Sequence, residues 1–355
     1  MSTGRTEGAT SAGGAMSTED ATSAEGALSV AEAVAELPRR FGQPAAEFTA
    51  SGSAALEVAL ELLEIGPGDE VVVPDVGCHS VAAAVVRVGA VPVFTGVGEA
   101  LTLEPEHVAA ACGSRTRAVI AVHQYGLPCD VPGIVAAVAP EVTVIEDVAQ
   151  TWGSSVRGVP AGATGALAVT SFGPSKPVAL GAGGALLGPA SAVTGTVAHG
   201  DGGDRHLPRA PSPARFPAPL LELLPGAVAR ADRRLRQRAE AVARFTRDEL
   251  AAHFRLPPMP PDSTAGWTRM PLYPLDPLDT PDPLHPLDPV RPAEPAEPAT
   301  DARVARIEAV FGPVQRMHPL PPSALPMFRR SAIRVVPGGH RPTQPLLVRI
   351  GRQPR

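Results

Sequence analysis

The chain has 355 residues, a length that suggests one large domain with a smaller one, or two domains. Its net charge is −5 and no basic stripe is interleaved with aromatic residues, which argues against a nucleic-acid partner. No apolar run reaches the roughly 18–20 residues of a membrane span, and the N-terminus lacks the basic-then-apolar order of a signal peptide. The three cysteines have no CxxC spacing, so we expect reduced thiols, no metal site and a cytoplasmic location.

Residues 1–26 are mostly Ser, Thr, Gly, Ala and Glu without apolar periodicity, and we expect a disordered leader. Residues 28–41 have helical periodicity. Beyond them, short apolar runs typical of buried strands alternate with helical segments. The expected strands are 70–74, 92–94, 118–122, 142–145, 167–172 and 185–187, and the expected helices between them are 81–88, 105–111 and 131–138. This alternation predicts an α/β fold with a mostly parallel central sheet covered by helices on both faces.

The C-terminal third has a different character. Residues 220–250 form a helical, arginine-rich pattern that we interpret as a connecting helix, and 257–298 carry a proline every few positions. Such a segment should be extended and mobile and should form no central strand or helix. Helical periodicity returns at 300–311. The predicted organisation is a leader (1–26), a large domain (27–215), a connecting helix (216–255) and a small, abbreviated C-terminal α+β domain (256–355) interrupted by the proline-rich segment.

One lysine attracts attention, because Lys176 is the only lysine in the chain. It lies in a loop of small residues between two expected strands, and a glycine-rich run (181–184) follows it. Arginine replaces lysine at the other basic positions, but a guanidinium stays protonated and cannot form a Schiff base. A pyridoxal 5'-phosphate (PLP) site is therefore a specific hypothesis for this loop.

PLP chemistry requires an amine, a carboxylate at the pyridine nitrogen, a hydrogen bond to the ring 3-oxygen and a phosphate site. Lys176 offers the amine, Asp147 the carboxylate and Gln150 the third contact. Phosphate would bind at the helix that starts near residue 52, where backbone N–H groups are free. The candidates for this role are Gly52, Ser53, Ala54 and Ser171.

Each candidate also has a purely structural explanation. Asp147 could cap a helix, and Gln150 could be an ordinary solvated residue. Ser51 or Ser53 could simply cap the helix that follows. Ser171 could satisfy backbone groups at the end of its strand. The order of these residues along the chain, and their expected positions at strand ends, favour a shared site.

The segment from Ser51 to Gly184 resembles the DegT/DnrJ/EryC1/StrS family of PLP-dependent aminotransferases, which act on sugars and have fold type I. The motifs that carry the resemblance are Ser51-Gly52-Ser53-Ala54-Ala55-Leu56, Gly66-Pro67-Gly68-Asp69-Glu70-Val71-Val72-Val73-Pro74, Gly89-Ala90-Val91-Pro92-Val93-Phe94, His123-Gln124-Tyr125-Gly126, Ile145-Glu146-Asp147-Val148-Ala149-Gln150, and Ser171-Phe172 with Lys176.

The resemblance implies that Lys176 is the Schiff-base lysine and that Asp147 contacts the pyridine nitrogen. It also implies transamination from an amino-acid donor, often glutamate, to a keto-sugar or related polyhydroxylated ketone, in secondary metabolism or cell-surface sugar synthesis. Members are usually homodimers whose partner subunit completes each active site. Where many members place an aromatic residue over the cofactor ring, this chain has Cys78, with His79 beside it. Either could lie over the ring face, and we favour Cys78. Gly173 and Pro177 also depart from the family pattern.

Two other hypotheses stay open. A PLP-dependent sugar dehydratase would share the fold, but relatives of that kind replace the lysine with histidine. A non-catalytic or regulatory relative would fit the short C-terminal half of the chain. Catalysis predicts that Lys176→Ala abolishes the biological role, whereas a regulator would keep it.

Overall fold

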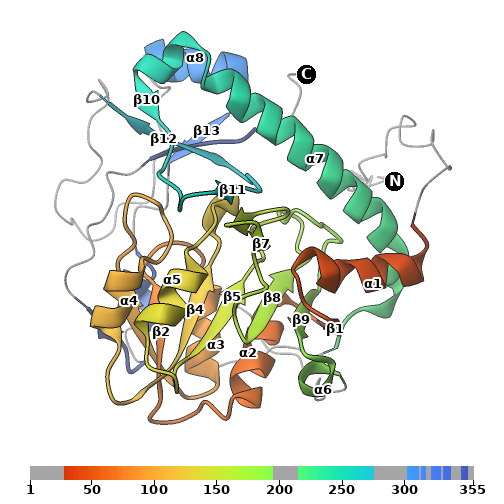
Figure 1. The fold of residues 1–355 in the computed structure, drawn as a ribbon, viewed down its shortest axis with the longest axis vertical. Coiled ribbons are helices and arrows are strands. Elements are labelled where there is room, and N and C mark those ends of the chain that lie inside the picture. Colours follow the sequence, from red (N-terminus) through yellow and green to blue (C-terminus); the bar gives the residue numbers. More distant parts are fainter. Residues whose placement is uncertain are drawn as a thin grey trace, which may run out of the picture.

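The computed structural model describes residues 28–194, 215–275, 302–311, 313–316, 321–328, 331–336 and 345–350 (Figure 1). The leader expected at 1–26 and the greater part of the proline-rich segment, 276–298, lie outside the described residues. The remainder contains a large sheet with helices on both faces, a smaller antiparallel sheet, and a long helix that runs along one side of the molecule.

The large sheet has eight strands and confirms the predicted mostly parallel α/β fold. In spatial order they are β1 (Ala45–Thr49), β9 (Gly184–Gly188), β8 (Leu167–Ser171), β5 (Thr143–Asp147), β4 (Thr116–Val122), β2 (Glu70–Pro74), β3 (Val91–Thr95) and β14 (Arg334–Val335). Every neighbouring pair from β8 to β14 is parallel, and β9 runs antiparallel to both β8 and β1.

The helices pack on both faces because the strands are apolar on both sides. In β2, Val71 and Val73 belong to the core beneath α2 (Gly52–Leu62) and α3 (Ser80–Arg87). Val72 between them points the other way, into the core of α4 (Pro105–Ala111) and α5 (Val131–Ala137). Successive side chains of a strand point to opposite faces, so a run of valines is buried from both sides.

Helices α1 (Val30–Arg40) and α7 (Leu224–Phe245) cover the β8–β9 side of the sheet, where the third apolar core lies. Asp232 of α7 joins them: its carboxylate accepts hydrogen bonds from both Nη atoms of Arg40, each at 3.1 Å. The same carboxylate accepts from Trp152 Nε1 at 2.8 Å. Helix α7 is therefore fixed against the loop that follows β5. None of the helices in the described ranges has the length and apolarity of a membrane span.

The smaller sheet has the order β10 (Phe254–Arg255), β12 (Met270–Pro274), β15 (Leu346–Val348) and β13 (Val314–Arg316). It packs with α8 (Ala302–Phe311), which confirms the helix expected near 300–311, and with the C-terminal end of α7. A third, short sheet consists of β11 (Ser263–Thr264), β6 (Ser155–Val156) and β7 (Val159–Pro160), and it joins residues 263–264 to the loop after β5.

The expectation that residues 257–298 contain no central strand is wrong for Met270–Pro274. This strand lies between two others, and its first four residues are buried. Pro271 is tolerated because strand β10 is short. Strand β10 pairs only with Tyr273 and Pro274, so Pro271 has a neighbour on the β15 side alone. At that position the strand is an edge strand, where a missing N–H costs little.

Candidate active site

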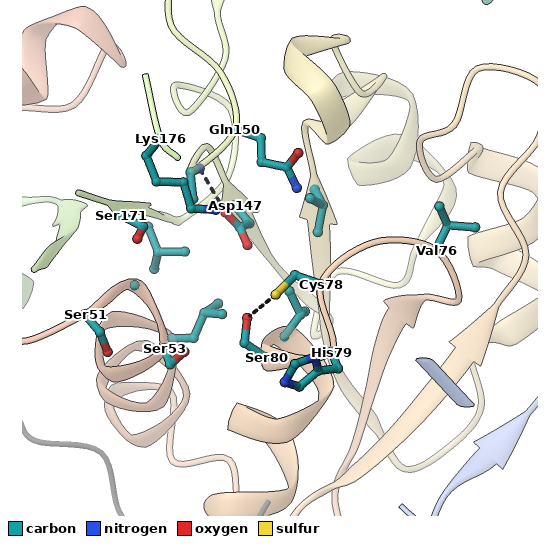
Figure 2. A pocket seen from close by; sticks show the side chains of 16 residues that line it. Ser51, Ser53, Val76, Cys78, His79, Ser80, Asp147, Gln150, Ser171 and Lys176 are labelled. Carbon is teal, nitrogen blue, oxygen red and sulfur yellow. Dashed lines mark hydrogen bonds between the residues drawn. The ribbon is translucent and has the colours of Figure 1, made fainter. Parts of the chain in front are cut away.

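A cavity of about 280 Å³ lies where the parallel strands β2, β4, β5 and β8 end. Ligands in α/β sheets bind at these carboxyl ends, because the connecting loops open there. Figure 2 shows Lys176 and Asp147 close together in this cavity, with Gln150 on one side and Ser53 and Ser171 on the other.

Asp147 is the last residue of β5 and is 7% exposed. One carboxylate oxygen, Oδ1, accepts a hydrogen bond from the backbone N–H of Ala149 at 2.9 Å. Burial raises the pKa of Asp147 above its ordinary value, although the positive charge of Lys176, the Ala149 N–H and His123 act in the opposite direction. The alternative that Asp147 caps a helix is therefore wrong: a turn follows β5, and the carboxylate that bonds within this turn also lines the cavity.

Lys176 is half-buried in the loop between β8 and β9. Its backbone N–H donates to the Gly173 carbonyl at 3.0 Å, which closes a tight turn. The N–H of Phe172 bonds Gly183 and the N–H of Leu180 bonds Phe172, both at 2.9 Å. The loop is thus closed at its base, and this closure holds the lysine at the cavity wall.

The N-terminus of helix α2 forms the opposite wall. Ser51 caps this helix, since its Oγ accepts from the Ala54 N–H at 3.1 Å. The N–H groups of Gly52 and Ser53 are then the ones that this helix end offers to an anion. A Cβ at Gly52 would lie 2.8 Å from the Cβ of Ser171, so glycine is needed for α2 to approach the end of β8.

The Gln150 side chain lines the cavity and also forms hydrogen bonds that hold a neighbouring turn. Its Oε1 accepts from the Tyr125 N–H at 3.2 Å, and its Nε2 donates to Gln124 Oε1 at 2.9 Å. Tyr125 has a positive φ of 57° and lies in the 3₁₀ turn Gln124–Gly126, which Gln150 therefore stabilises. An amide nitrogen carries two N–H groups, so the Gln124 bond uses one of them.

The loop after β2 closes the third side. The Cys78 thiol is exposed, lines the cavity, and lies 3.0 Å from Ser80 Oγ. Cys129, in contrast, is fully buried, and burial, with the nearby carboxylates, raises the pKa of its thiol far above the ordinary value. Cys78 is thus the thiol that a ligand in this cavity would meet.

The structure brings together all but one of the residues selected from the sequence. Lys176, Asp147, Gly52, Ser53, Cys78, Gln150 and Ser171 all line the cavity. Ala54 does not: it is buried, and its N–H bonds the capping serine. Sequence reasoning missed Ser80, whose only signal was its place just before the helix expected at 81–88. Within the described residues, no cluster of three or more His, Cys, Asp or Glu could hold a metal ion.

Comparison with known proteins identifies the class to which this fold and site belong. The structure of DesV from S. venezuelae superposes with a TM-score of 0.70 at 25% identity, covering 92% of this chain and 85% of that one. The model of the DegT/DnrJ/EryC1/StrS aminotransferase family matches residues 12–196, more than half of the chain. The chain belongs to this family.

Two curated relatives are similar to part of this chain. UDP-N-acetyl-3-dehydro-alpha-D-glucosamine 3-aminotransferase of Acidithiobacillus ferrooxidans is 47% identical over 131 residues, which are 36% of this chain and 35% of the relative. L-glutamine:2-deoxy-scyllo-inosose aminotransferase of Streptomyces lividus is 39% identical over 159 residues, 42% of this chain and 38% of the relative. The chain thus spans somewhat more than a third of the length of these relatives.

Proposed function

We propose that the protein is a PLP-dependent aminotransferase that transfers an amino group from an amino acid, such as glutamate, to a keto-sugar or a related polyhydroxylated ketone. The observation that carries this proposal is the presence of Lys176 and Asp147 in one cavity at the carboxyl ends of the parallel strands. The substrate class is supported by the names of the two relatives, which act on a UDP-linked dehydro-glucosamine and on 2-deoxy-scyllo-inosose.

The residues present fit the cofactor. The cavity combines an amine at Lys176, a buried carboxylate at Asp147 and the N-terminus of α2 with the hydroxyls of Ser53 and Ser171. Glycine at position 52 leaves the space that a Cβ would fill beside Ser171. When bound, PLP supplies an electron sink and a carrier for the amino group. Its amine-reactive end would lie toward Lys176 and its phosphate toward α2.

Each residue then has a distinct task. Lys176 Nζ would hold the cofactor through its amine and move the proton to and from the substrate carbon. The carboxylate of Asp147 would keep the ring nitrogen protonated, and its burial strengthens that interaction because few water molecules compete with it. The N–H groups of Gly52 and Ser53 and the hydroxyl of Ser171 would bind the phosphate. Gln150 would orient the ring through its amide, and Cys78 would lie over the ring face.

The presence of a single lysine makes this proposal easy to test. The full chain mixed with PLP should show a visible absorbance band that glutamate bleaches. Borohydride reduction followed by peptide mass analysis should find the cofactor on Lys176. Lys176→Ala should lose both the band and the labelled peptide, because the chain contains no second lysine. A wild-type chain that shows no band with PLP would refute the proposal.

We further propose that the protein acts as a homodimer in the cytoplasm, with residues 27–215 as its cofactor domain, 216–255 as the connecting helix and 256–355 as a small domain. Membership of the family supports the dimer, and the three free cysteines are consistent with a reducing compartment. Sedimentation equilibrium of the full chain should give twice the mass of one chain; a monomer with full activity would contradict the dimer.

A further inference from the structure

The loop between β2 and α3 is held by a residue from far along the chain. One wall of the cavity consists of Val76, Cys78, His79 and Ser80 (Figure 2). Directly before them, the carboxylate of Asp75 accepts two hydrogen bonds from Ser323. The Ser323 N–H donates to Oδ1 at 2.9 Å, and the Ser323 hydroxyl donates to Oδ2 at 2.7 Å. The C-terminal part of the chain therefore contacts the residue at which this wall of the cavity begins.

The segment that carries Ser323 has anchors of its own on the large sheet. Phe328 is 1% exposed and belongs to the core beneath α2 and α3, where its ring lies 5.7 Å from that of Phe94 in a T-shaped arrangement. Further along, β14 pairs with β3, and the Val336 N–H donates to the Phe94 carbonyl at 2.9 Å. Two buried prolines, Pro321 and Pro322, precede Ser323 and restrict its backbone. The segment can therefore hold Asp75 in a defined place.

The wall that Asp75 begins has weak local support. Helix α3 starts after His79 without a side-chain cap at its N-terminus, whereas Ser51 caps α2. Gly77 has a φ of 112°, and glycine loses more conformational freedom on ordering than any other residue. At Asp75 itself, the backbone N–H donates to the Thr95 carbonyl at 2.9 Å. The order of the residues that follow therefore depends on how firmly Asp75 is fixed.

The position of this loop also affects Gln150. A Cβ at Gly77 would lie 2.8 Å from Gln124 Oε1, so the loop backbone is in close contact with that amide. The same Oε1 accepts from Gln150 Nε2 at 2.9 Å. A displacement of the loop would therefore disturb the cavity in two places, at Cys78 and at Gln150.

We propose that Ser323 is a positioning residue of the active site: by holding Asp75 it orders residues 76–80 for cofactor binding. The inference rests on the proposed aminotransferase function. Neither Ser323 nor Asp75 lines the cavity, so both act through the loop. Hydrogen bonds to a carboxylate are among the strong ones, and a loop that is ordered in advance spares the ligand the entropic cost of ordering it.

The binding test measures the affinity of the full chain for PLP by absorbance titration. Ser323→Ala should weaken PLP binding about tenfold, roughly the effect of losing one hydrogen bond to a charged group. Ser323→Thr keeps a hydroxyl and should restore the affinity to within about threefold of the wild type. The matched control is Ser331→Ala, at a half-buried serine further along the same segment, which should stay within about twofold.

Hydrogen exchange separates local order from overall stability. In the full chain before PLP is added, Ser323→Ala should speed amide exchange in peptides that cover residues 76–80. Peptides from α5, on the opposite face of the sheet, should exchange at the wild-type rate. Faster exchange in both regions would mean that Ser323 only stabilises the fold, and it would overturn the proposal.

A double-mutant cycle tests whether Ser323 acts through Asp75. Asp75→Ala should weaken PLP binding at least as much as Ser323→Ala, and the double variant should be no weaker than Asp75→Ala alone. Additive losses would show that the two residues act separately and would reject the inference. Failure of the aminotransferase proposal would look different, because the wild type would then form no absorbance band with PLP. A normal band, with equal PLP affinity in wild type and Ser323→Ala, would reject the present inference alone.

Discussion

The imidazole of His123 and the carboxylate of Glu146 form a buried pair in which Nε2 lies 2.8 Å from Oε2 and neither side chain is more than 1% exposed. His123 Nδ1 accepts the Cys129 N–H at 3.1 Å, so the ring proton is on Nε2 and is donated to the carboxylate. Glu146 also accepts backbone N–H groups from the 162–165 loop. One carboxylate therefore joins the turn before Cys129, strand β5 and that loop, directly beside Asp147.

Replacing Glu146 with glutamine should destabilise the protein. The carboxylate accepts four hydrogen bonds, and an amide in its place would present N–H groups to some of these donors. We expect Glu146→Gln to lower the free energy of unfolding by about 1.5–3 kcal/mol, measured in urea at pH 7. Glu141→Gln, at an exposed carboxylate two residues before β5 begins, should change it by less than about 0.5 kcal/mol. Equal effects from both variants would contradict a specific role for Glu146.

The pH dependence of stability provides a second check on the same residue. Burial raises the pKa of Glu146, but the net effect of its surroundings is to lower this pKa below the ordinary 4.5. The opposing contributions come from the hydrogen bond and charge of His123 and from the backbone N–H groups of Gly165 and Gly162. Since folding lowers this pKa, the stabilisation is present above pH 4.5 and is lost as the pH falls through the lower folded value. Wild type should therefore lose more stability than Glu146→Gln upon acidification below about pH 4.5. An identical acid dependence in both proteins would refute this assignment.

Asp147 should behave in the opposite way. Burial raises its pKa above the ordinary 3.8, so folding favours the protonated form. Its contribution to stability is then present below pH 3.8 and is lost as the pH rises through the raised folded pKa. At pH 7 the charged carboxylate costs stability, as expected for a residue retained for chemistry. Asp147→Asn should unfold at higher urea than wild type at pH 7, with a smaller difference near pH 4, and should transaminate poorly.

The matched control for this variant is Asp262→Asn. Asp262 is exposed, and its positive φ of 54° is one that asparagine also adopts readily. We expect it to leave both unfolding and transamination close to those of the wild type. An Asp147→Asn protein less stable than wild type at pH 7 would show that the attraction to Lys176 outweighs the cost of burial.

Gly52→Ala should affect both folding and cofactor binding. Its Cβ would lie 2.8 Å from the Ser171 Cβ and 3.3 Å from the Thr170 carbonyl, so α2 and β8 would have to separate. Such overpacking costs about 1–3 kcal/mol, and the displaced helix end should bind PLP more weakly. Gly66→Ala is the matched control, because its Cβ would meet only the Val88 carbonyl at 3.8 Å. PLP affinity unchanged in Gly52→Ala would argue against a phosphate at this helix end.

Much of the fold could be predicted because each buried strand is a continuous apolar run. Val71, Val72 and Val73 are buried on alternate faces, and that requirement is visible in the sequence. Several polar residues of the cavity could also be predicted, because Asp147 and Ser171 are the last residues of β5 and β8, and Gln150 and Lys176 lie in the loops after these strands. The chemical type of each residue and its place at a strand end are both properties of local sequence.

What could not be predicted depends on contacts between distant segments. Strand β12 was missed because a proline has no N–H to donate and is not expected in a strand that is paired along both edges. Pro271 is tolerated because β10 is too short to pair with it. The residues just before this strand, Thr268 and Arg269, line a smaller cavity beside Lys176. Their approach to Lys176 depends on the docking of residues 266–268 onto the Gln124–Gly126 turn, which no local pattern indicates.

Cys78 should be the thiol that reports on occupancy of the cavity. It is exposed and lines the cavity, whereas burial raises the pKa values of Cys112 and Cys129. Iodoacetamide at pH 8 should therefore alkylate Cys78 first, and saturating PLP should slow this reaction at least about tenfold while leaving the other two thiols unaffected. Peptide mass analysis over time measures the three rates, and Cys78→Ser is the control that removes the fast site. Alkylation of Cys78 at the same rate with and without PLP would show that the cofactor does not cover it.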